Sequence, residues 1–278
     1  MSVLAIRNVW KQYGAQVVLE RINLTVPARE FCTIVGASGC GKTTFLRMLL
    51  GQETPSRGAF ELDGQPLRGE PGPERGVVFQ RYSVFPHLTV RDNVLLGLEL
   101  GASRLSGRLF GAARRQALAR VDAALQAVGL EGAAAKYPSA LSGGMQQRLA
   151  IAQALIKQPK ILLLDEPFGA LDPGIRADMH KLLLGLWRAT GMTVFMITHD
   201  LREAFALGTR LLVFDKVRRD PQAPERFGAT ITFDIPLARR NAADDDALRA
   251  LQARADYYTG AAPAAFPSAQ TGAALELP

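Results

Sequence analysis

Residues 36–44 have the composition and spacing of a loop that could bind phosphate. They read GASGCGKTT, which is Gly, four residues, Gly, Lys and Thr, and they follow the apolar run 31–35. The glycines permit the backbone angles that turn successive amide N–H groups toward one phosphate, and the helix predicted over 43–50 adds its positive end. Lys42 would neutralise the β- and γ-phosphates, and Thr43 would offer its hydroxyl to Mg²⁺. We therefore expect nucleotide contacts from Gly36, Ala37, Ser38, Gly39, Cys40, Gly41, Lys42, Thr43 and Thr44.

Two carboxylates end a second apolar run, ILLLDE, at residues 161–166. A carboxylate at the carboxyl edge of a parallel sheet lies where ligands bind. Asp165 is therefore a candidate for holding Mg²⁺, directly or through water, and Glu166 is the candidate general base for an attacking water. Alone, such a pair is more often a solvated strand end, but the phosphate loop upstream reverses that preference. Kinases and GTPases share both elements, so the reaction is still open at this point.

The segment LSGGMQQR, residues 141–148, lies between these two elements and narrows the choice. Ser142 can cap the helix that follows, and Gly143 and Gly144 leave its amides open, which makes a second anion site. The segment resembles the signature motif of ABC ATPases, and it stands where that family has it. The resemblance implies that this helix tip closes on the γ-phosphate of ATP held by a second cassette in a head-to-tail dimer; an ordinary serine-capped helix is the alternative.

The same resemblance assigns further residues one at a time. Tyr13, in KQYG, matches the aromatic residue that stacks on adenine, although an aromatic residue in a turn usually packs against its own chain. Gln80, after the strand VVF, matches the glutamine that senses Mg²⁺ and water. Asp172, in GALD, matches the loop at the dimer interface, and it could also simply cap a helix that begins near Pro173. His199, in MITHD, matches the histidine that contacts the γ-phosphate and orders the water, so Lys42, Gln80, Glu166 and His199 form the predicted catalytic set.

Two details lie outside this pattern. His87 and His180 match nothing catalytic. The fifth signature residue is Met145, where the family most often has glutamine. Because the expected phosphate contacts come from Ser142 and the glycine amides, we expect activity to survive this departure.

The elements that must position these residues alternate along the chain. Strands are expected at 4–9, 31–35, 76–79, 161–164, 193–197 and 210–214, with helices between several of them. This succession predicts an α/β fold with a mainly parallel sheet. The resemblance implies that this fold is a P-loop NTPase core of the ABC ATPase type. An N-terminal antiparallel β subdomain and a helical subdomain at about 87–158 complete a domain over 1–237. Residues 238–278 are expected to form a C-terminal extension, a helix followed by a loose tail.

Composition limits where such a protein can work. The chain has 278 residues and a formal net charge of +7, but its basic residues are scattered, so we expect no nucleic acid partner. Two cysteines are too few for a disulfide framework and suit a reducing cytoplasm. Neither a secretory signal nor an apolar run long enough to span a bilayer is evident. Any membrane contact is therefore expected to go through a partner.

The resemblance also implies the assembly. A cassette without a fused membrane domain resembles the importer arrangement, in which a homodimer of cassettes works with transmembrane permease subunits and, indirectly, a substrate-binding protein. The segment ITFDIPLARR is similar to the nitrate/sulfonate/taurine group, whereas the stretches 101–115 and 216–228 depart from its plainest members. The expected place is the cytoplasmic face of the inner membrane, as a peripheral subunit, with a permease helix docked near Gln80, Tyr82, Phe85, Pro86 and His87. The alternatives are a soluble ABC ATPase of translation or DNA repair, and a regulatory cassette that has lost its base.

Overall fold

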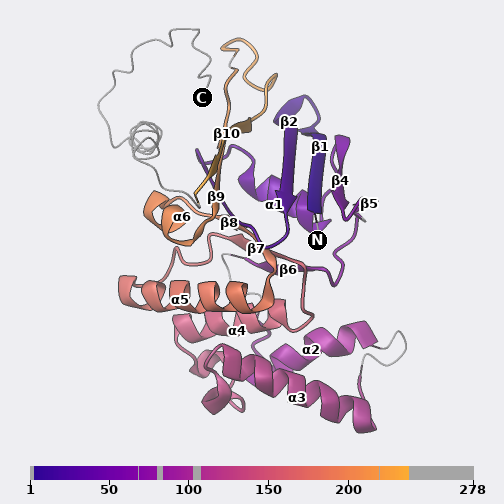
Figure 1. Cartoon of the computed structure of the whole chain (residues 1–278), viewed down its shortest axis with the longest axis vertical. Coiled ribbons are helices and arrows are strands. Elements are labelled where there is room, and N and C mark those ends of the chain that lie inside the picture. The colour runs from indigo at the N-terminus through magenta and orange to yellow at the C-terminus, as the bar shows by residue number, and fades with distance from the viewer. Residues whose placement is uncertain (1–2, 68, 80–83, 103–107, 219, 238–278) are drawn as a thin grey trace. The chain divides into compact units, whose positions relative to one another are not determined.

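The structure, a computed structural model, describes residues 3–67, 69–79, 84–102, 108–218 and 220–237. Within these residues the larger sheet has six strands in the order β10, β9, β3, β8, β7 and β6 (Figure 1). The strands β9, β3, β8, β7 and β6 run parallel, and β10 pairs antiparallel with β9. Their bounds are β3 Phe31–Gly36, β6 Arg75–Val78, β7 Ile161–Asp165, β8 Thr193–Ile197, β9 Arg210–Asp215 and β10 Thr230–Pro236.

A smaller antiparallel sheet is built mostly from the N-terminal segment. Its order is β2, β1, β4, β5, with β1 Val3–Tyr13, β2 Gln16–Pro27, β4 Arg57–Leu62 and β5 Gln65–Pro66. The hairpin of β1 and β2 confirms the predicted N-terminal antiparallel subdomain. The pattern of the sequence did not predict β4 and β5, which are short and follow a turn rather than an alternating apolar run.

Helix α1, Lys42–Leu50, packs between the two sheets. Its buried Phe45 and Leu49 belong to one apolar cluster with residues of both sheets, among them Leu19 of β2, Ile34 of β3 and Leu163 of β7. Strand residues that alternate with these, such as Leu162 and Val194, face the opposite side of the larger sheet and join a second cluster. The larger sheet is therefore buried on both faces, as its continuous apolar strands require.

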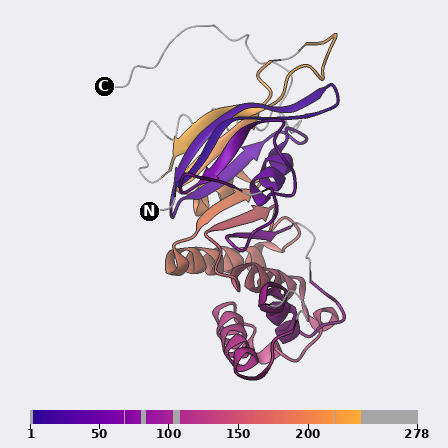
Figure 2. The same cartoon turned by 90° about the vertical axis from the view of Figure 1, so that its right-hand side faces the viewer.

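Helices α2 Val90–Ala102, α3 Gly111–Ala127 and α4 Gly143–Leu155 form a group in the second cluster, with short 3₁₀ turns at Glu131–Ala133 and Pro138–Ala140. Both views show this group gathered at one end, away from the antiparallel sheet (Figures 1 and 2). The predicted helical subdomain is confirmed. Both ends of the stretch 101–115 are helical: α2 continues to Ala102, and α3 begins at Gly111.

Two further helices complete the described fold, α5 Pro173–Thr190 and α6 Leu201–Leu207. Neither the short α6 nor β10 is among the elements predicted from the sequence. The loop between β9 and β10 folds back onto β2, where Arg218 makes a 2.7 Å ion pair with Glu20 and Val17 N donates to the Glu225 carbonyl at 2.8 Å. Among the described residues no helix has the length and apolarity to cross a bilayer. The predicted C-terminal extension, 238–278, lies outside the described residues.

Candidate functional site

The glycine-rich loop leads from the carboxyl end of β3 into the N-terminus of α1. Gly39 and Gly41 have left-handed φ angles of 76° and 91°, which glycine adopts at little cost. A Cβ on Gly36 would lie 2.2 Å from the Phe214 carbonyl oxygen, so this glycine is also required by close packing. No side chain caps α1, whose first N–H groups can therefore serve an anion. Lys42 Nζ crosses the loop and donates to the carbonyls of Gly36 at 2.7 Å and Ala37 at 2.9 Å.

Thr43 and Asp165 are brought together from α1 and β7. The Thr43 hydroxyl donates to Asp165 Oδ1 at 3.4 Å. Burial raises the pKa of the Asp165 carboxyl, the hydrogen bond from Thr43 opposes that rise, and the neighbouring Glu166 adds to it. In the part of the chain that the structure describes, no three His, Cys, Asp or Glu side chains gather to hold a metal. A hydroxyl beside one carboxylate, next to a phosphate cradle, is nevertheless the donor set by which Mg²⁺ is held together with phosphate oxygens and water.

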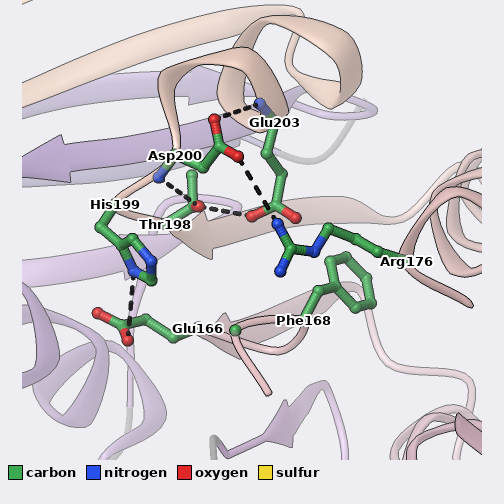
Figure 3. Close-up of a pocket in the computed structure, with 8 residues that line it drawn as sticks. Glu166, Phe168, Arg176, Thr198, His199, Asp200 and Glu203 are labelled. Carbon is green, nitrogen blue, oxygen red and sulfur yellow. Dashed lines mark hydrogen bonds and ion pairs between the residues drawn. The ribbon is translucent and has the colours of Figure 1, made fainter. Parts of the chain in front are cut away.

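Glu166 and His199 meet at the same sheet edge. His199 Nδ1 lies 3.6 Å from Glu166 Oε2, and the side chains are 68% and 29% exposed (Figure 3). Glu166 has a φ of 46°, a left-handed angle that is uncommon outside glycine, and its N–H donates to the Ile197 carbonyl at 3.1 Å. The carboxylate is thus held at the end of β7, opposite the end of β8, and both side chains can reach solvent.

Behind this pair lies a small pocket whose polar side chains fix the turn that carries His199 (Figure 3). Asp200 N donates to the Thr198 hydroxyl at 3.1 Å, and that hydroxyl donates to the buried carboxylate of Glu203. Glu203 Oε1 is also 2.8 Å from His180 Nε2 of α5. The pocket is lined by Glu166, Phe168, Gly169, Arg176, Thr198, His199, Asp200 and Glu203.

Sequence reasoning missed this supporting layer. Asp200 and Glu203 have the Asp-x-x-Glu spacing of a capping box, a signal that could have predicted where α6 begins. Asp200 does cap α6 by accepting from Arg202 N at 2.8 Å, but Glu203 turns inward to Thr198 instead of back to the cap. His180, which matches nothing catalytic, contacts Glu203 and the ring of Phe168.

Tyr13 lies at the end of β1, at the tip of the hairpin, and is 46% exposed. Its hydroxyl donates to Glu53, which follows α1, and Lys11 Nζ lies 4.7 Å from the centre of its ring. Burial raises the pKa of the Tyr13 phenol, the hydrogen bond to Glu53 raises it further, and a hydrogen bond with Thr44 opposes the rise. Tyr13 therefore lies next to Thr44 in the first turn of α1, directly after the glycine-rich loop.

The signature segment forms the start of α4, as predicted. Ser142 is the N-cap residue, and its hydroxyl accepts from Met145 N at 3.3 Å. The Met145 side chain packs against the helical cluster, so it does not compete at the helix tip. Gly143 is exposed, whereas Gly144 is buried and a Cβ there would lie 2.7 Å from Cγ2 of Ile175 in α5. Gly144 is thus needed for helix packing as well as for an open amide.

Of the two remaining predicted residues, the structure describes Asp172 but not Gln80. Asp172 is exposed and occupies the N-cap position of α5, but its side chain makes no capping hydrogen bond, which leaves the carboxylate available to a partner. Arg176, one turn later, donates to the Leu171 carbonyl at 3.1 Å and lies 3.8 Å from Asp200. Gln80 and Tyr82 lie outside the described residues.

Comparisons with known proteins agree with this geometry. A family model described as ABC transporter matches residues 19–169. The taurine import ATP-binding protein TauB of Escherichia coli (strain K12) is 44% identical over 211 residues, 76% of this chain and 79% of that protein. The nitrate import ATP-binding protein NrtD of Synechococcus elongatus is 42% identical over 232 residues, 84% of this chain and 81% of that protein. A solved dimer of the ATP-binding cassette MJ0796 bound to ADP and Pi is 28% identical, with a TM-score of 0.68, and the match covers 86% of this chain and 100% of that one.

Proposed function

Because this chain belongs to the ABC transporter family, whose cassettes bind and hydrolyse ATP, we propose that it is the ATPase subunit of an ABC importer. Closure of a cassette dimer on ATP would drive solute uptake through a membrane permease. The observation that carries the proposal is the shared sheet edge, where the Glu166–His199 pair lies beside the Lys42 loop and the Thr43–Asp165 pair.

The described residues can perform hydrolysis with a simple division of roles. The loop amides and Lys42 bind and neutralise the β- and γ-phosphates. Glu166 accepts a proton from water as the water oxygen bonds to the γ-phosphorus and the bond to the bridging oxygen breaks, which yields ADP and phosphate. His199, held by its supporting pocket, orders the water and the γ-phosphate. Thr43 and Asp165 would hold Mg²⁺, which when bound offsets phosphate charge; Gln80 is proposed to assist there.

Dimerisation would complete each site. The Ser142 hydroxyl and the amides of Gly143 and Gly144, at the tip of α4, would contact the γ-phosphate of ATP held by a second copy. The exposed carboxylate of Asp172 would lie at that interface. The assembly of the related cassette as a dimer with ADP and Pi supports this proposal. Tyr13 would stack on the adenine in the same chain.

We infer the chemical class of the transported solute from the relatives. The named relatives serve import of taurine and nitrate, so we propose a nitrate-, sulfonate- or taurine-like small anion or zwitterion, delivered by a substrate-binding protein. The cassette would act as a peripheral subunit at the cytoplasmic face of the inner membrane and bind no nucleic acid. Its permease would dock near Phe85, which is 43% exposed on a turn fixed by the buried Asn93 through Phe85 N and the carbonyls of Phe85, Leu88 and Thr89.

Affinity purification of the tagged full chain from solubilised membranes tests the proposal. Recovery of permease subunits, with ATPase activity that rises when a loaded binding protein is added, is the expected result. Recovery with ribosomes or DNA instead would favour the translation or repair alternative. ATP binding without any hydrolysis by the recovered complex would favour the regulatory cassette.

A further inference from the structure

A compact charged cluster surrounds the hydroxyl of Tyr13. The hydroxyl donates to Glu53, and the Glu53 carboxylate also lies 3.2 Å from Lys11 Nζ and 3.7 Å from Arg47 Nη1. The Lys11 and Glu53 side chains are only 12% and 19% exposed. Charged side chains this close and this shielded from water hold one another more firmly than ordinary surface pairs.

The cluster restricts both the edge and one face of the Tyr13 ring. Glu53 holds the hydroxyl at the edge, and Lys11 Nζ lies over the ring at 4.7 Å from its centre, a cation–π contact. Burial acts to raise the pKa of the Glu53 carboxyl, but the hydrogen bonds from Tyr13 and Lys11 hold it below its ordinary value. With Lys11 on one face, a planar base can stack only on the other face.

The cluster also joins the ring to the helix that begins at the phosphate loop. Glu53 N donates to the Arg47 carbonyl at 3.3 Å, and Lys11 Nζ donates to the Thr54 carbonyl at 3.0 Å. Arg47 is in the last turn of α1, and Lys42 begins the same helix. The first residue of α1, Lys42, is thus the proposed phosphate contact, and the last turn of the helix holds Glu53, which supports the Tyr13 ring.

We propose that Glu53 is a positioning residue for nucleotide binding, which with Lys11 fixes the Tyr13 ring so that its open face meets the base. This inference rests on the proposed function of Tyr13 as the adenine platform. A ring held in place before binding loses little side-chain freedom when the base arrives, so ATP binds more tightly. The base is remote from the γ-phosphate, so the benefit is equal in the ground state and the transition state, and Kd and KM change while kcat does not.

Full-chain variants test the proposal by ATP binding and steady-state hydrolysis. Glu53→Ala should raise the Kd and KM for ATP about three- to tenfold with kcat within about twofold of wild type. Glu53→Gln, whose amide oxygen can still accept from the hydroxyl, should restore most of the affinity. Glu61→Ala is the matched control, because it removes a carboxylate paired with Arg7 in the same sheet at 3.0 Å without touching Tyr13.

A double-mutant cycle separates this inference from the proposed function. If Glu53 acts through the ring, Glu53→Ala should have no further effect on Kd in a Tyr13→Ala background. An unchanged Kd in Tyr13→Ala alone would refute the stacking role and this inference with it. A raised Kd in Tyr13→Ala, with Glu53→Ala unchanged or fully additive, would overturn only the positioning role.

An NMR titration of Tyr13 tests whether Glu53 acts through its contact with the Tyr13 hydroxyl and not through a general change in structure. In ¹³C-tyrosine NMR the Tyr13 signal, assigned with Tyr13→Phe, should titrate at lower pH in Glu53→Ala than in wild type, because a hydrogen bond and a negative charge that both raise the pKa of the phenol are removed. An unmoved titration would contradict the contact on which the proposal depends. Should Glu53→Ala fail to fold, Tyr13→Phe removes the hydroxyl that Glu53 holds and keeps the ring. It should raise the Kd for ATP by a similar factor, and an unchanged Kd would contradict the proposal.

Discussion

Glu166 and His199 lie 3.6 Å apart because their strands are neighbours in register. Asp165 at the end of β7 pairs with Ile197 at the end of β8, so the residues that follow emerge side by side at one sheet edge. The relationship is set by backbone pairing and not by the side chains themselves. A change of either side chain should therefore alter the chemistry and leave the strands in place.

Glu166→Gln should reduce the rate of ATP hydrolysis by about 10²- to 10⁴-fold, since the amide cannot accept the proton of the attacking water. ATP binding should be retained, and the variant should accumulate as an ATP-bound dimer. Phosphate release and size-exclusion chromatography with ATP measure the two effects. Turnover at the wild-type rate would remove Glu166 from the mechanism.

The candidate site residues could be predicted from the sequence wherever a functional residue lies inside a short motif that identifies it. The phosphate loop, the carboxylates of 161–166 and the signature segment are of this kind. The structure has the first two at the ends of β3 and β7 and the third at the start of α4. Their spacing reflects short-range backbone geometry.

The supporting contacts could not be predicted, because they join residues far apart in sequence. His180 and Glu203 are 23 positions apart and Tyr13 and Glu53 are 40 apart, and no period or propensity links them. Strand β4 is not predicted for a related reason, since it is half-exposed and pairs with β1, far away in the sequence. Strand β10 is also half-exposed and pairs with β9 across the long loop between them.

Glu203→Ala should destabilise the chain by about 1–3 kcal/mol and lower kcat, because Thr198 and His180 would lose a buried partner and the His199 turn would loosen. Urea denaturation and steady-state kinetics measure both. Glu131→Ala, at an exposed position, is the control and should change neither. A stable Glu203→Ala variant with unchanged kcat would show that the pocket does not support His199.

Gly144→Ala should lower the melting temperature, because the new Cβ would meet Ile175 Cγ2 at 2.7 Å. The double variant Gly144→Ala, Ile175→Ala removes the clash and should regain much of the lost stability. Calorimetry of the two variants and of Ile175→Ala distinguishes packing from anion binding. If the double variant is no more stable than the sum of its single changes predicts, packing is not the reason for this glycine.

Ser142→Phe should leave ATP binding to the single cassette within about twofold and impair dimer closure, because the exposed helix tip is remote from the chain's own phosphate loop in the proposed arrangement. Fluorescent nucleotide titration measures the first property. Light scattering of the variant in a Glu166→Gln background measures the second. Dimerisation equal to that of Glu166→Gln alone would count against a composite site.

The ion pairs of Glu53 should make a contribution to stability that depends on pH. Its folded-state pKa is lowered from an ordinary value of 4.5, chiefly by the hydrogen bonds from Tyr13 and Lys11 against the effect of burial. The contribution is therefore present above that value and is lost as pH falls through the lower folded-state pKa. Urea denaturation should show wild type more stable than Glu53→Gln at pH 7, with the difference shrinking below about pH 4.5. A difference that widens on acidification would contradict the assignment.

The left-handed backbone at Glu166 bears on how such a cassette could lose its ATPase activity. A glutamate held at a φ of 46° is retained against the preference of its own main chain, whereas glycine or asparagine would relax there. Replacement of Glu166 by glycine or asparagine would abolish ATP turnover and raise the stability of the folded chain. Catalytic activity and folding stability therefore oppose each other at position 166, and a cassette that lost its activity there would be the more stable protein.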